Sequence, residues 1–239
     1  MKHLSRLDIE GISLRIIEAY KKLPEISGQK LYRIDPVLLC ESLLHLNIDY
    51  MHLSLDGSIL GMTSFEELGV EIFEDDDADA FYILDGKTVL VESELKKDIT
   101  MRGRCNFTIA HEASHQIFKM LFPQDYGANR NVPAVHFYQT HSEKKKPISN
   151  WEEWQANTLA AAILIPQELI GQALFLFGLP EKIEILNRRI APAIYDKFVA
   201  MADFMGCSKT ALAIRLKQLG ILKKDYLDRP CGWFDVEGY

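Results

Sequence analysis

Two histidines and a glutamate with the spacing of a metal site lie near the middle of the chain. His111, Glu112 and His115 form the pattern H-E-x-x-H. Residues four apart on an α-helix share a face, so both imidazoles can reach one ion, and Glu112 would lie beside it, about 100° further round the axis. Zinc accepts neutral imidazole ligands and lowers the pKa of a bound water to about 7, so a nearby carboxylate can take the proton. The three residues therefore predict a zinc site with Glu112 as general base.

A helix must position these side chains, and the surrounding residues predict one. Apolar side chains recur at helical spacing from Phe107 to Leu121, and Pro123 marks the expected end. The alternative is a surface helix that carries two histidines by chance. The pattern fixes only three positions, so chance matches occur. These residues alone leave both interpretations open.

Composition limits the class of protein. The 239 residues are 48% hydrophobic and 26% charged, which is typical of a soluble globular chain with one large or two small domains. A formal net charge of −7 argues against affinity for nucleic acid over the whole surface. The four cysteines form no C-x-x-C pair and no signal-peptide run opens the chain, so we expect reduced thiols in the cytoplasm. Leu159–Leu179 is apolar but interrupted by Pro166 and Gly171, so we expect no membrane span.

The N-terminal part is predicted to be helical. Residues 9–23 carry apolar side chains at helical spacing, and Pro24 ends this helix. Asp35 and Pro36 are typical of an N-cap and a first helical position, so a short helix is expected over residues 35–46.

The next part is predicted to contain strands. Residues 79–85 and 87–93 are short β-rich runs, and the Asp85-Gly86 dipeptide between them predicts a hairpin. The acidic run 74–79 lacks the spacing of an EF-hand, so we interpret it as a solvated turn rather than a calcium loop.

A long polar connection, residues 123–150, follows the H-E-x-x-H helix and is interpreted as a lid or a flexible insert. His136 and His141 in this connection are alternative third ligands, although solvated loop histidines are the favoured interpretation. Tyr138, His136 or His141 are also candidates to donate a hydrogen bond to an oxyanion.

The C-terminal half is predicted to be helical, with helices over residues 151–165, 167–177 and about 181–205. Glu153 and Asn157 share a face of the first of these helices. Residues 201–222 are similar to a helix-turn-helix, with Gly206 at the turn and Ser208 as N-cap. We favour packing of this pair over DNA reading, because no other basic surface is evident. The basic residues here are Lys209, Arg215, Lys217, Lys223 and Lys224.

Three stretches together resemble one family. They are R-C-N-F-T-I-A-H-E-A-S-H at residues 104–115, E-W-Q-A-N-T-L-A-A-A-I-L-I-P at 153–166 and G-C-S-K-T-A-L-A-I-R-L-K-Q-L-G-I at 206–221. In this order they resemble the ImmA/IrrE family of metallopeptidases. The resemblance covers roughly residues 35 to 222.

The resemblance implies an α+β, zincin-like fold and zinc-dependent proteolysis, typically of a helix-turn-helix repressor. It implies that His111, His115 and Glu153 are the zinc ligands, that Glu112 is the general base, and that Asn157 supports a ligand or a helix contact. In a zincin arrangement an edge strand beside the active helix can pair with an extended substrate. The implied organisation is a helical arm (residues 1–34), a metallopeptidase core (35–180) and a C-terminal helical region (181–239).

Two departures from the family pattern stand out. Ser114 replaces the usual Gly before the second histidine, and Gln155 replaces the second acid of the E-x-E-A-N stretch. Glu153 is then the better third ligand, with Glu152 as an alternative. Two other functions stay open: a non-cleaving protein that sequesters a repressor and holds a structural zinc, and a DNA-binding regulator that uses residues 208–219.

Overall fold

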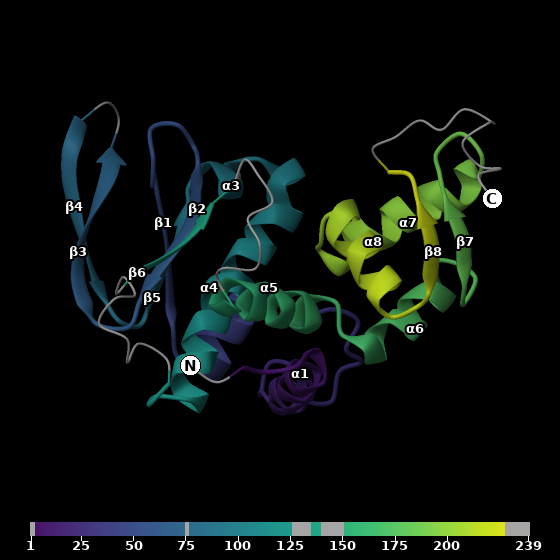
Figure 1. The fold of residues 1–239 in the computed structure, drawn as a ribbon, viewed down its shortest axis with the longest axis horizontal. Coiled ribbons are helices and arrows are strands. Elements are labelled where there is room, and N and C mark those ends of the chain that lie inside the picture. Colours follow the sequence, from purple (N-terminus) through teal and green to yellow (C-terminus); the bar gives the residue numbers. More distant parts are fainter. Residues whose placement is uncertain (1–2, 75–76, 126–134, 140–150, 228–239) are drawn as a thin grey trace. The chain divides into compact units, whose positions relative to one another are not determined.

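The computed structural model describes residues 3–74, 77–125, 135–139 and 151–227. It confirms the predicted α+β class, with small sheets and a largely helical C-terminal part (Figure 1). The chain divides into two compact units, one formed by Met1–Gln29 with Asp35–Leu164 and the other by Lys30–Ile34 with Ile165–Tyr239.

The boundary between the units differs from the predicted domain limits. We expected residues 1–34 to form a separate arm and the core to continue to residue 180. Instead, α1 (Arg6–Tyr20) packs against α5 (Trp151–Leu164) inside the first unit. The backbone N–H of Leu4 also donates a hydrogen bond of 2.9 Å to the Gln155 side chain. The N-terminal helix is thus part of the first unit, which ends with α5.

The first unit is built on a four-stranded mixed sheet. Its strands are β1 (Asn47–Met51), β2 (Ile59–Ser64), β5 (Thr88–Glu92) and β6 (Val135–Gln139). In the order β1-β5-β2-β6, β1 and β5 are parallel, whereas β2 is antiparallel to both β5 and β6. A shift of register between Ile59 and Gly61 marks a bulge where β2 pairs with β6.

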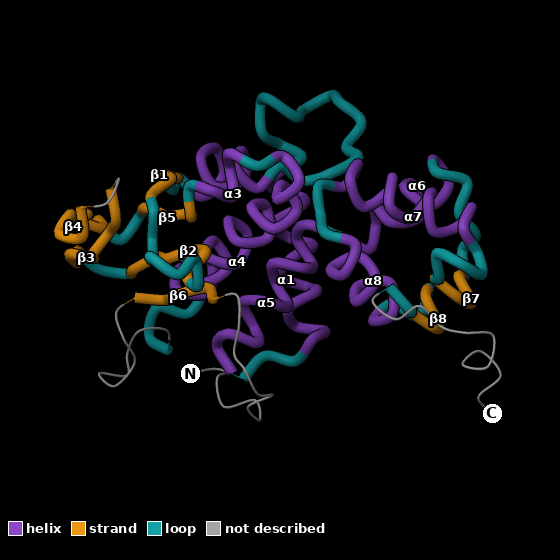
Figure 2. Tube along the Cα trace, turned by 90° about the horizontal axis from the view of Figure 1, so that it is seen from above, coloured by secondary structure: helices purple, strands orange, loops and turns teal. Residues whose placement is uncertain are grey.

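This sheet has a helix on one face and a hairpin on the other (Figure 2). The helix is α4 (Arg102–Leu121), and the hairpin consists of β3 (Glu67–Glu74) and β4 (Asp77–Asp85). Alternate residues of β5 serve the two faces: Val89 and Val91 belong to the core on the helix side, and Leu90 belongs to the core on the hairpin side. All of β5 is buried, which identifies it as a central strand.

The hairpin predicted at Asp85-Gly86 is wrong. Gly86 has a φ of 76° and does turn the chain, but β4 pairs with β3 while β5 pairs with β1 and β2. The dipeptide therefore signals a turn, and the pairing follows from the burial of both faces of β5. The acidic run lies at the end of the real hairpin, where Glu74 pairs with Asp77; residues 75–76 lie outside the described part.

Two helices near the N-terminus, α1 and the short helix after Asp35, begin at side-chain caps. Ser5 and Asp8 form a capping box at α1, which ends at Tyr20 rather than at Leu23. The Asp35 carboxylate accepts hydrogen bonds from two N–H groups in the first turn of the next helix. The shorter elements are α2 (Pro36–Leu38), η1 (Leu39–Leu44), α3 (Glu94–Lys97) and η2 (Ile99–Met101).

The second unit contains α6 (Gln167–Leu176), β7 (Ile183–Leu186), α7 (Pro192–Met205), α8 (Lys209–Gln218) and β8 (Leu222–Asp225). Our prediction of helix from residue 181 onwards is wrong for β7, which pairs in parallel with β8. Two β-branched residues, Ile183 and Ile185, suit this short strand. The turn between α7 and α8 is as predicted: Gly206 has a φ of 70°, and the Ser208 hydroxyl caps α8.

Within the described part, no single helix is long and apolar enough to cross a membrane, although the bent pair α5 and α6 meets the length and composition requirement together.

Candidate metal centre

Helix α4 places the two predicted histidine ligands side by side. His111 and His115 are four residues apart, and their Nε2 atoms are 3.2 Å from each other. Both side chains are completely buried, which a surface helix with chance histidines would not produce. The imidazole pair is therefore built into the interior of the first unit.

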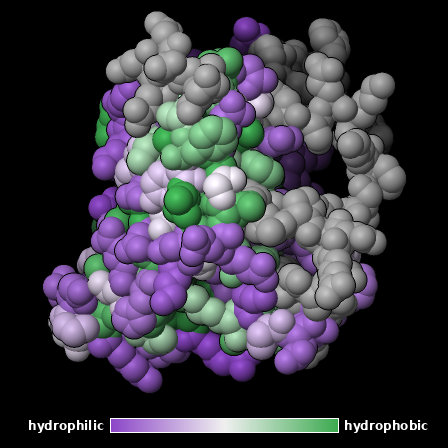
Figure 3. Space-filling model, turned by 90° about the vertical axis from the view of Figure 1, so that its left-hand side faces the viewer, coloured by the Kyte–Doolittle hydropathy of each residue, from purple (hydrophilic) through white to green (hydrophobic). Residues whose placement is uncertain are grey.

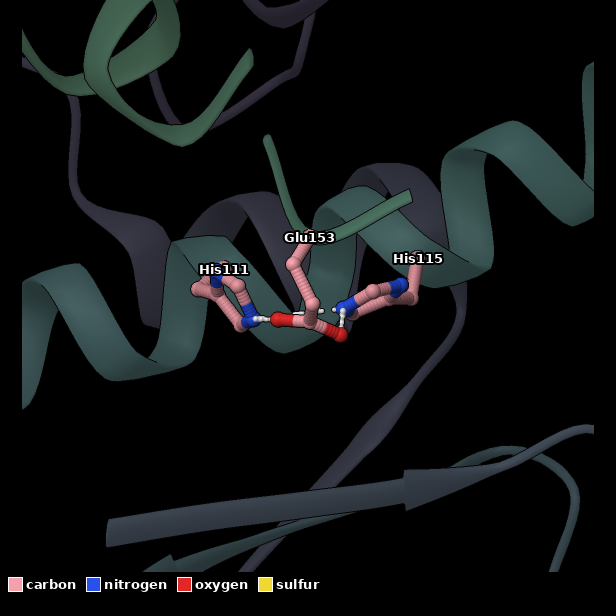
Figure 4. Close-up of side chains that lie close together, drawn as sticks. All are labelled: His111, His115 and Glu153. Atoms are coloured by element: carbon pink, nitrogen blue, oxygen red, sulfur yellow. Dashed lines mark hydrogen bonds and ion pairs between the residues drawn. The ribbon is translucent and has the colours of Figure 1, made fainter. Parts of the chain in front are cut away.

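Glu153, from the first turn of α5, completes the group (Figure 4). Its two carboxylate oxygens lie 3.2 Å from His111 Nε2 and 3.3 Å from His115 Nε2. The Asn157 side chain donates a hydrogen bond of 2.8 Å to the Glu153 backbone carbonyl, so it braces the helical turn that carries the carboxylate. Glu152, the alternative acid, is not part of the group of potential metal ligands found among the described residues.

These three side chains could hold a metal ion. With bonds of about 2.0–2.2 Å and tetrahedral angles, neighbouring ligand atoms would lie about 3.3–3.5 Å apart. The two Nε2 atoms are 3.2 Å apart, and they lie 3.2 and 3.3 Å from the two different carboxylate oxygens of Glu153. One atom from each residue lies within 4.8 Å of the others. Two imidazole nitrogens and one carboxylate are also a donor set typical of catalytic zinc, with a fourth position left for water or substrate.

The charge states favour ligation. Burial lowers the pKa of His115 to about 3, against the opposing effect of the nearby Glu153 carboxylate, so this imidazole is neutral at physiological pH. Burial alone would raise the pKa of Glu153, but hydrogen bonds from the neighbouring histidines outweigh it and lower that pKa. The two directions agree when a neutral His115 donates its N–H to an ionised Glu153. Metal binding requires the other tautomer of neutral His115, with Nε2 unprotonated, together with the ionised Glu153 carboxylate.

Glu112 lies next to this group, also on α4 and completely buried. Neither carboxylate oxygen has a hydrogen-bond partner within the described residues. Burial raises the pKa of Glu112 well above its usual range, and the charge of Glu153 raises it further. The backbone amide of Tyr138 lowers it slightly, without reaching hydrogen-bond geometry. Such a carboxylate has a strong tendency to take up a proton.

Gly61 on β2 makes room for the Glu112 side chain. A Cβ atom at this position would lie 3.0 Å from Glu112 Oε1 and 2.5 Å from Thr108 Cγ2. Such separations are too short for non-bonded atoms, so only glycine fits without movement. The absence of a side chain at Gly61 therefore lets the sheet approach the face of α4 that carries the carboxylate.

Strand β6 brings two of the predicted oxyanion donors to the site. The His136 ring stacks on His115 with 4.1 Å between ring centroids, and its Nδ1 lies 3.6 Å from the Glu153 carboxylate. The Tyr138 ring lies 4.5 Å from that of His111. Our favoured interpretation of His136 as a solvated loop residue is wrong, because it is buried on a strand. His141 lies outside the described residues.

Ser114 and Gln155, which depart from the pattern that the sequence resembles, each form a hydrogen bond. The Ser114 hydroxyl donates a hydrogen bond of 2.7 Å to the Ala110 carbonyl one turn earlier, so it needs no partner on α5. Gln155 accepts the hydrogen bond from Leu4 and ties the N-terminus to α5. Neither residue contributes a metal ligand.

Sequence reasoning missed the residues that join α4 to the sheet. The Gln116 amide donates hydrogen bonds of 2.7 Å to the Thr63 hydroxyl and to the Ser64 carbonyl on β2. The signal that could have revealed the contact was the glycine in an otherwise β-rich run, Ile59–Ser64, because glycine inside a strand often marks close approach of another element. Nothing comparable singles out Gln116.

Comparison with models of protein families gives no match, and the chain matches no curated protein sequence.

Proposed function

We propose that the protein is a zinc-dependent endopeptidase of the ImmA/IrrE type with a zincin-like first unit. One observation carries the proposal: two imidazoles and a carboxylate from different helices converge, with one ligand atom from each within 4.8 Å of the others, beside a buried Glu112. A simple hydrogen-bonded cluster would explain the convergence of the three side chains. It would not explain the fourth side chain, the buried Glu112 carboxylate, which has no hydrogen-bond partner among the described residues.

Zinc, when bound by His111, His115 and Glu153, supplies Lewis acidity that polarises a peptide carbonyl and makes water acidic near neutral pH. Glu112 accepts a proton from the attacking water, whose oxygen bonds to the carbonyl carbon. It then delivers that proton to the amide nitrogen as the C–N bond breaks. The raised pKa of Glu112 suits a group that must hold this proton between the two steps.

The carbonyl oxygen needs a further hydrogen-bond donor as negative charge develops on it. His136 and Tyr138 are the candidates that we favour, since their rings lie against those of His115 and His111 respectively. We assign the role to this pair on β6. An extended substrate strand running along β6 would present its carbonyl to the same region.

The substrate we propose is a helix-turn-helix repressor, and the protein would act as an anti-repressor in the cytoplasm. Support for the substrate comes from the motif resemblance alone. The described cysteines, Cys40, Cys105 and Cys207, are buried free thiols, which agrees with a reducing compartment.

The test compares Glu112→Gln with Glu152→Gln, a neighbouring acid that supplies no ligand. Glu112→Gln should retain about one zinc per chain, measured by inductively coupled plasma mass spectrometry, and lose cleavage of the repressor encoded beside the gene. Glu152→Gln should retain both zinc and cleavage. Fragments produced at the normal rate by Glu112→Gln would refute the mechanism.

The same experiment distinguishes cleavage of the repressor from sequestration without cleavage. A stable complex with the repressor, without fragments and insensitive to both a chelator and Glu112→Gln, would favour a non-cleaving binder.

A DNA-binding role receives little support from the second unit. Arg215 is buried and donates to the Ile165 carbonyl, while Lys217 and Lys223 form ion pairs with Asp225 and Glu184. These pairs leave less of the basic charge of α8 and β8 available for phosphates. Absent or salt-independent binding in a gel shift would remove this alternative.

A further inference from the structure

An apolar groove lies on the face of the sheet opposite the metal centre. It has a volume of about 520 Å³ and runs between the sheet and strand β3. Its floor includes Ile59 and Met62 of β2, Val70 of β3 and Phe137 of β6. A volume of this size accommodates a large side chain.

Strand β6 links the groove to the metal centre. His136 and Tyr138 contact the histidines of α4, whereas Phe137, between them, lines the groove on the other face. In the described part of the chain, β6 is the last strand of its sheet and pairs only with β2. A peptide strand added along its open edge would alternate in the same way. One side chain would point towards the metal side, and the next would point towards the groove.

The rim of the groove adds a charge preference. Asp56 and Glu71 line it and are exposed, and no Lys, Arg or His is among the described residues that line it. The exposed Leu55 extends the apolar surface outwards. Figure 3, which faces the β3–β4 side, shows hydrophobic surface bordered by hydrophilic residues. An apolar floor with a negative rim complements a large apolar side chain that has basic neighbours.

We propose that this groove is a specificity subsite for a large apolar side chain, flanked by basic residues, in an extended peptide segment that pairs with β6. This inference rests on the proposed peptidase function, because that function is the reason to expect a peptide beside β6. It goes further by stating which segment of a protein substrate would be selected.

Binding is measured separately from cleavage. The probes are fluorescein-labelled decapeptides of alanine and threonine with a central phenylalanine or alanine and two flanking lysines or glutamates. They are titrated by fluorescence anisotropy into zinc-loaded Glu112→Gln protein. We expect the phenylalanine-lysine peptide to bind roughly ten-fold more tightly than the alanine-lysine peptide. Replacing lysine by glutamate should weaken binding several-fold.

Variants of the groove should change these preferences selectively. Phe137→Ala should reduce the preference for phenylalanine over alanine to about two-fold or less, since one wall is lost. Glu71→Lys should abolish or reverse the preference for lysine. The matched control is Glu67→Lys, an equal change of charge on the same strand at an exposed position outside the groove lining. It should leave both preferences unchanged.

The outcomes separate this proposal from the function on which it rests. Cleavage of the same peptides by the zinc-loaded wild type, with no dependence on the central residue or on Phe137, would overturn the subsite and leave the peptidase intact. Selective binding without cleavage of any peptide would support the subsite and refute the peptidase. A third outcome is self-association in sedimentation velocity, abolished by Phe137→Ala, with no preference among the peptides. The occupant of the groove would then be a second copy of the chain, and the proposal would be overturned.

Discussion

Gly61→Ala tests whether the close approach of β2 to α4 holds the Glu112 carboxylate in place. The new Cβ would lie 2.5 Å from Thr108 Cγ2, 3.0 Å from Glu112 Oε1 and 3.1 Å from Glu112 Cγ. Carbon atoms in van der Waals contact are about 3.5–4.0 Å apart, so the Thr108 methyl or the strand must move by about 1 Å. Thr108 is β-branched and buried on a helix, which restricts the rotation that would relieve the clash.

The expected loss has two components. Overpacking costs about 1–3 kcal/mol of unfolding free energy, offset by about 0.4–1 kcal/mol from the lower chain entropy of alanine in the unfolded state. A net loss of about 1–2 kcal/mol in unfolding free energy corresponds to a Tm roughly 2–8 °C lower in a chain of this size. A general base displaced by about 1 Å can reduce kcat/KM by about 100-fold. Zinc content should stay unchanged, because none of the three atoms nearest to the added Cβ belongs to a proposed zinc ligand.

A matched control and a rescue sharpen the test. Gly69→Ala on β3 has no atom within 4 Å of the added Cβ, so it should show only the chain-entropy gain of about 0.4–1 kcal/mol and leave zinc content unchanged. Thr108→Ser removes the methyl group that clashes, so Gly61→Ala with Thr108→Ser should recover stability but only part of the activity. Thermal denaturation, zinc analysis and repressor cleavage provide the readouts. Unchanged stability and kcat/KM in Gly61→Ala, or no recovery in the double variant, would refute the reasoning.

The other predictions concern the ligands and the contacts that support them. Glu153→Ala should reduce bound zinc from about one per chain to near zero after dialysis, and an unchanged zinc content would exclude it as a ligand. Added zinc should raise the Tm of the metal-free wild type by mass action and leave that of Glu153→Ala unchanged. Gln116→Ala should lower the unfolding free energy in urea by about 1–3 kcal/mol, since two buried acceptors lose their donor; the exposed Gln172→Ala is the control, and equal effects would contradict the assignment. In metal-free protein, the pKa of Glu112 is higher in the folded state than in the unfolded state. Protonated Glu112 therefore contributes fully to stability below about pH 4.5, and this contribution is lost as the pH rises through the folded-state pKa. The stability advantage of Glu112→Gln over wild type should therefore grow above pH 4.5, and a constant difference would contradict the burial of this charge.

The residues of the candidate site were predictable because the relevant information is local. The i,i+4 spacing of His111 and His115 depends only on helix geometry, whereas Glu153 was implied as a ligand only by the resemblance of a second stretch to a family motif. The structure brings these residues together at the separations given above. The cap residues Ser208 and Asp35 were likewise readable, since a cap acts within one turn.

Features that depend on pairing between distant segments were not predictable in the same way. Asp85-Gly86 indicated a turn correctly but not that the flanking strands enter different sheets. His136 lies in a polar stretch without strong alternation, so its strand was hidden until pairing with β2 was known. The same holds for β7, which is only four residues long and finds its partner across α7 and α8. Short strands carry too few residues to show a period of two.

Helix α4 buries several polar atoms, and their cost to stability requires an explanation. Thr108 Oγ1, His111 Nδ1, His115 Nδ1 and both Glu112 carboxylate oxygens are buried without a hydrogen-bond partner among the described residues. Each such atom costs about 1–3 kcal/mol if it stays unpaired, and their combined cost would rival the whole stability of a domain. Apolar residues of similar size would fill the same space without that cost. Partners from outside the protein would remove this cost: water for the two Nδ1 atoms and Thr108 Oγ1, and the attacking water of the proposed hydrolysis for Glu112.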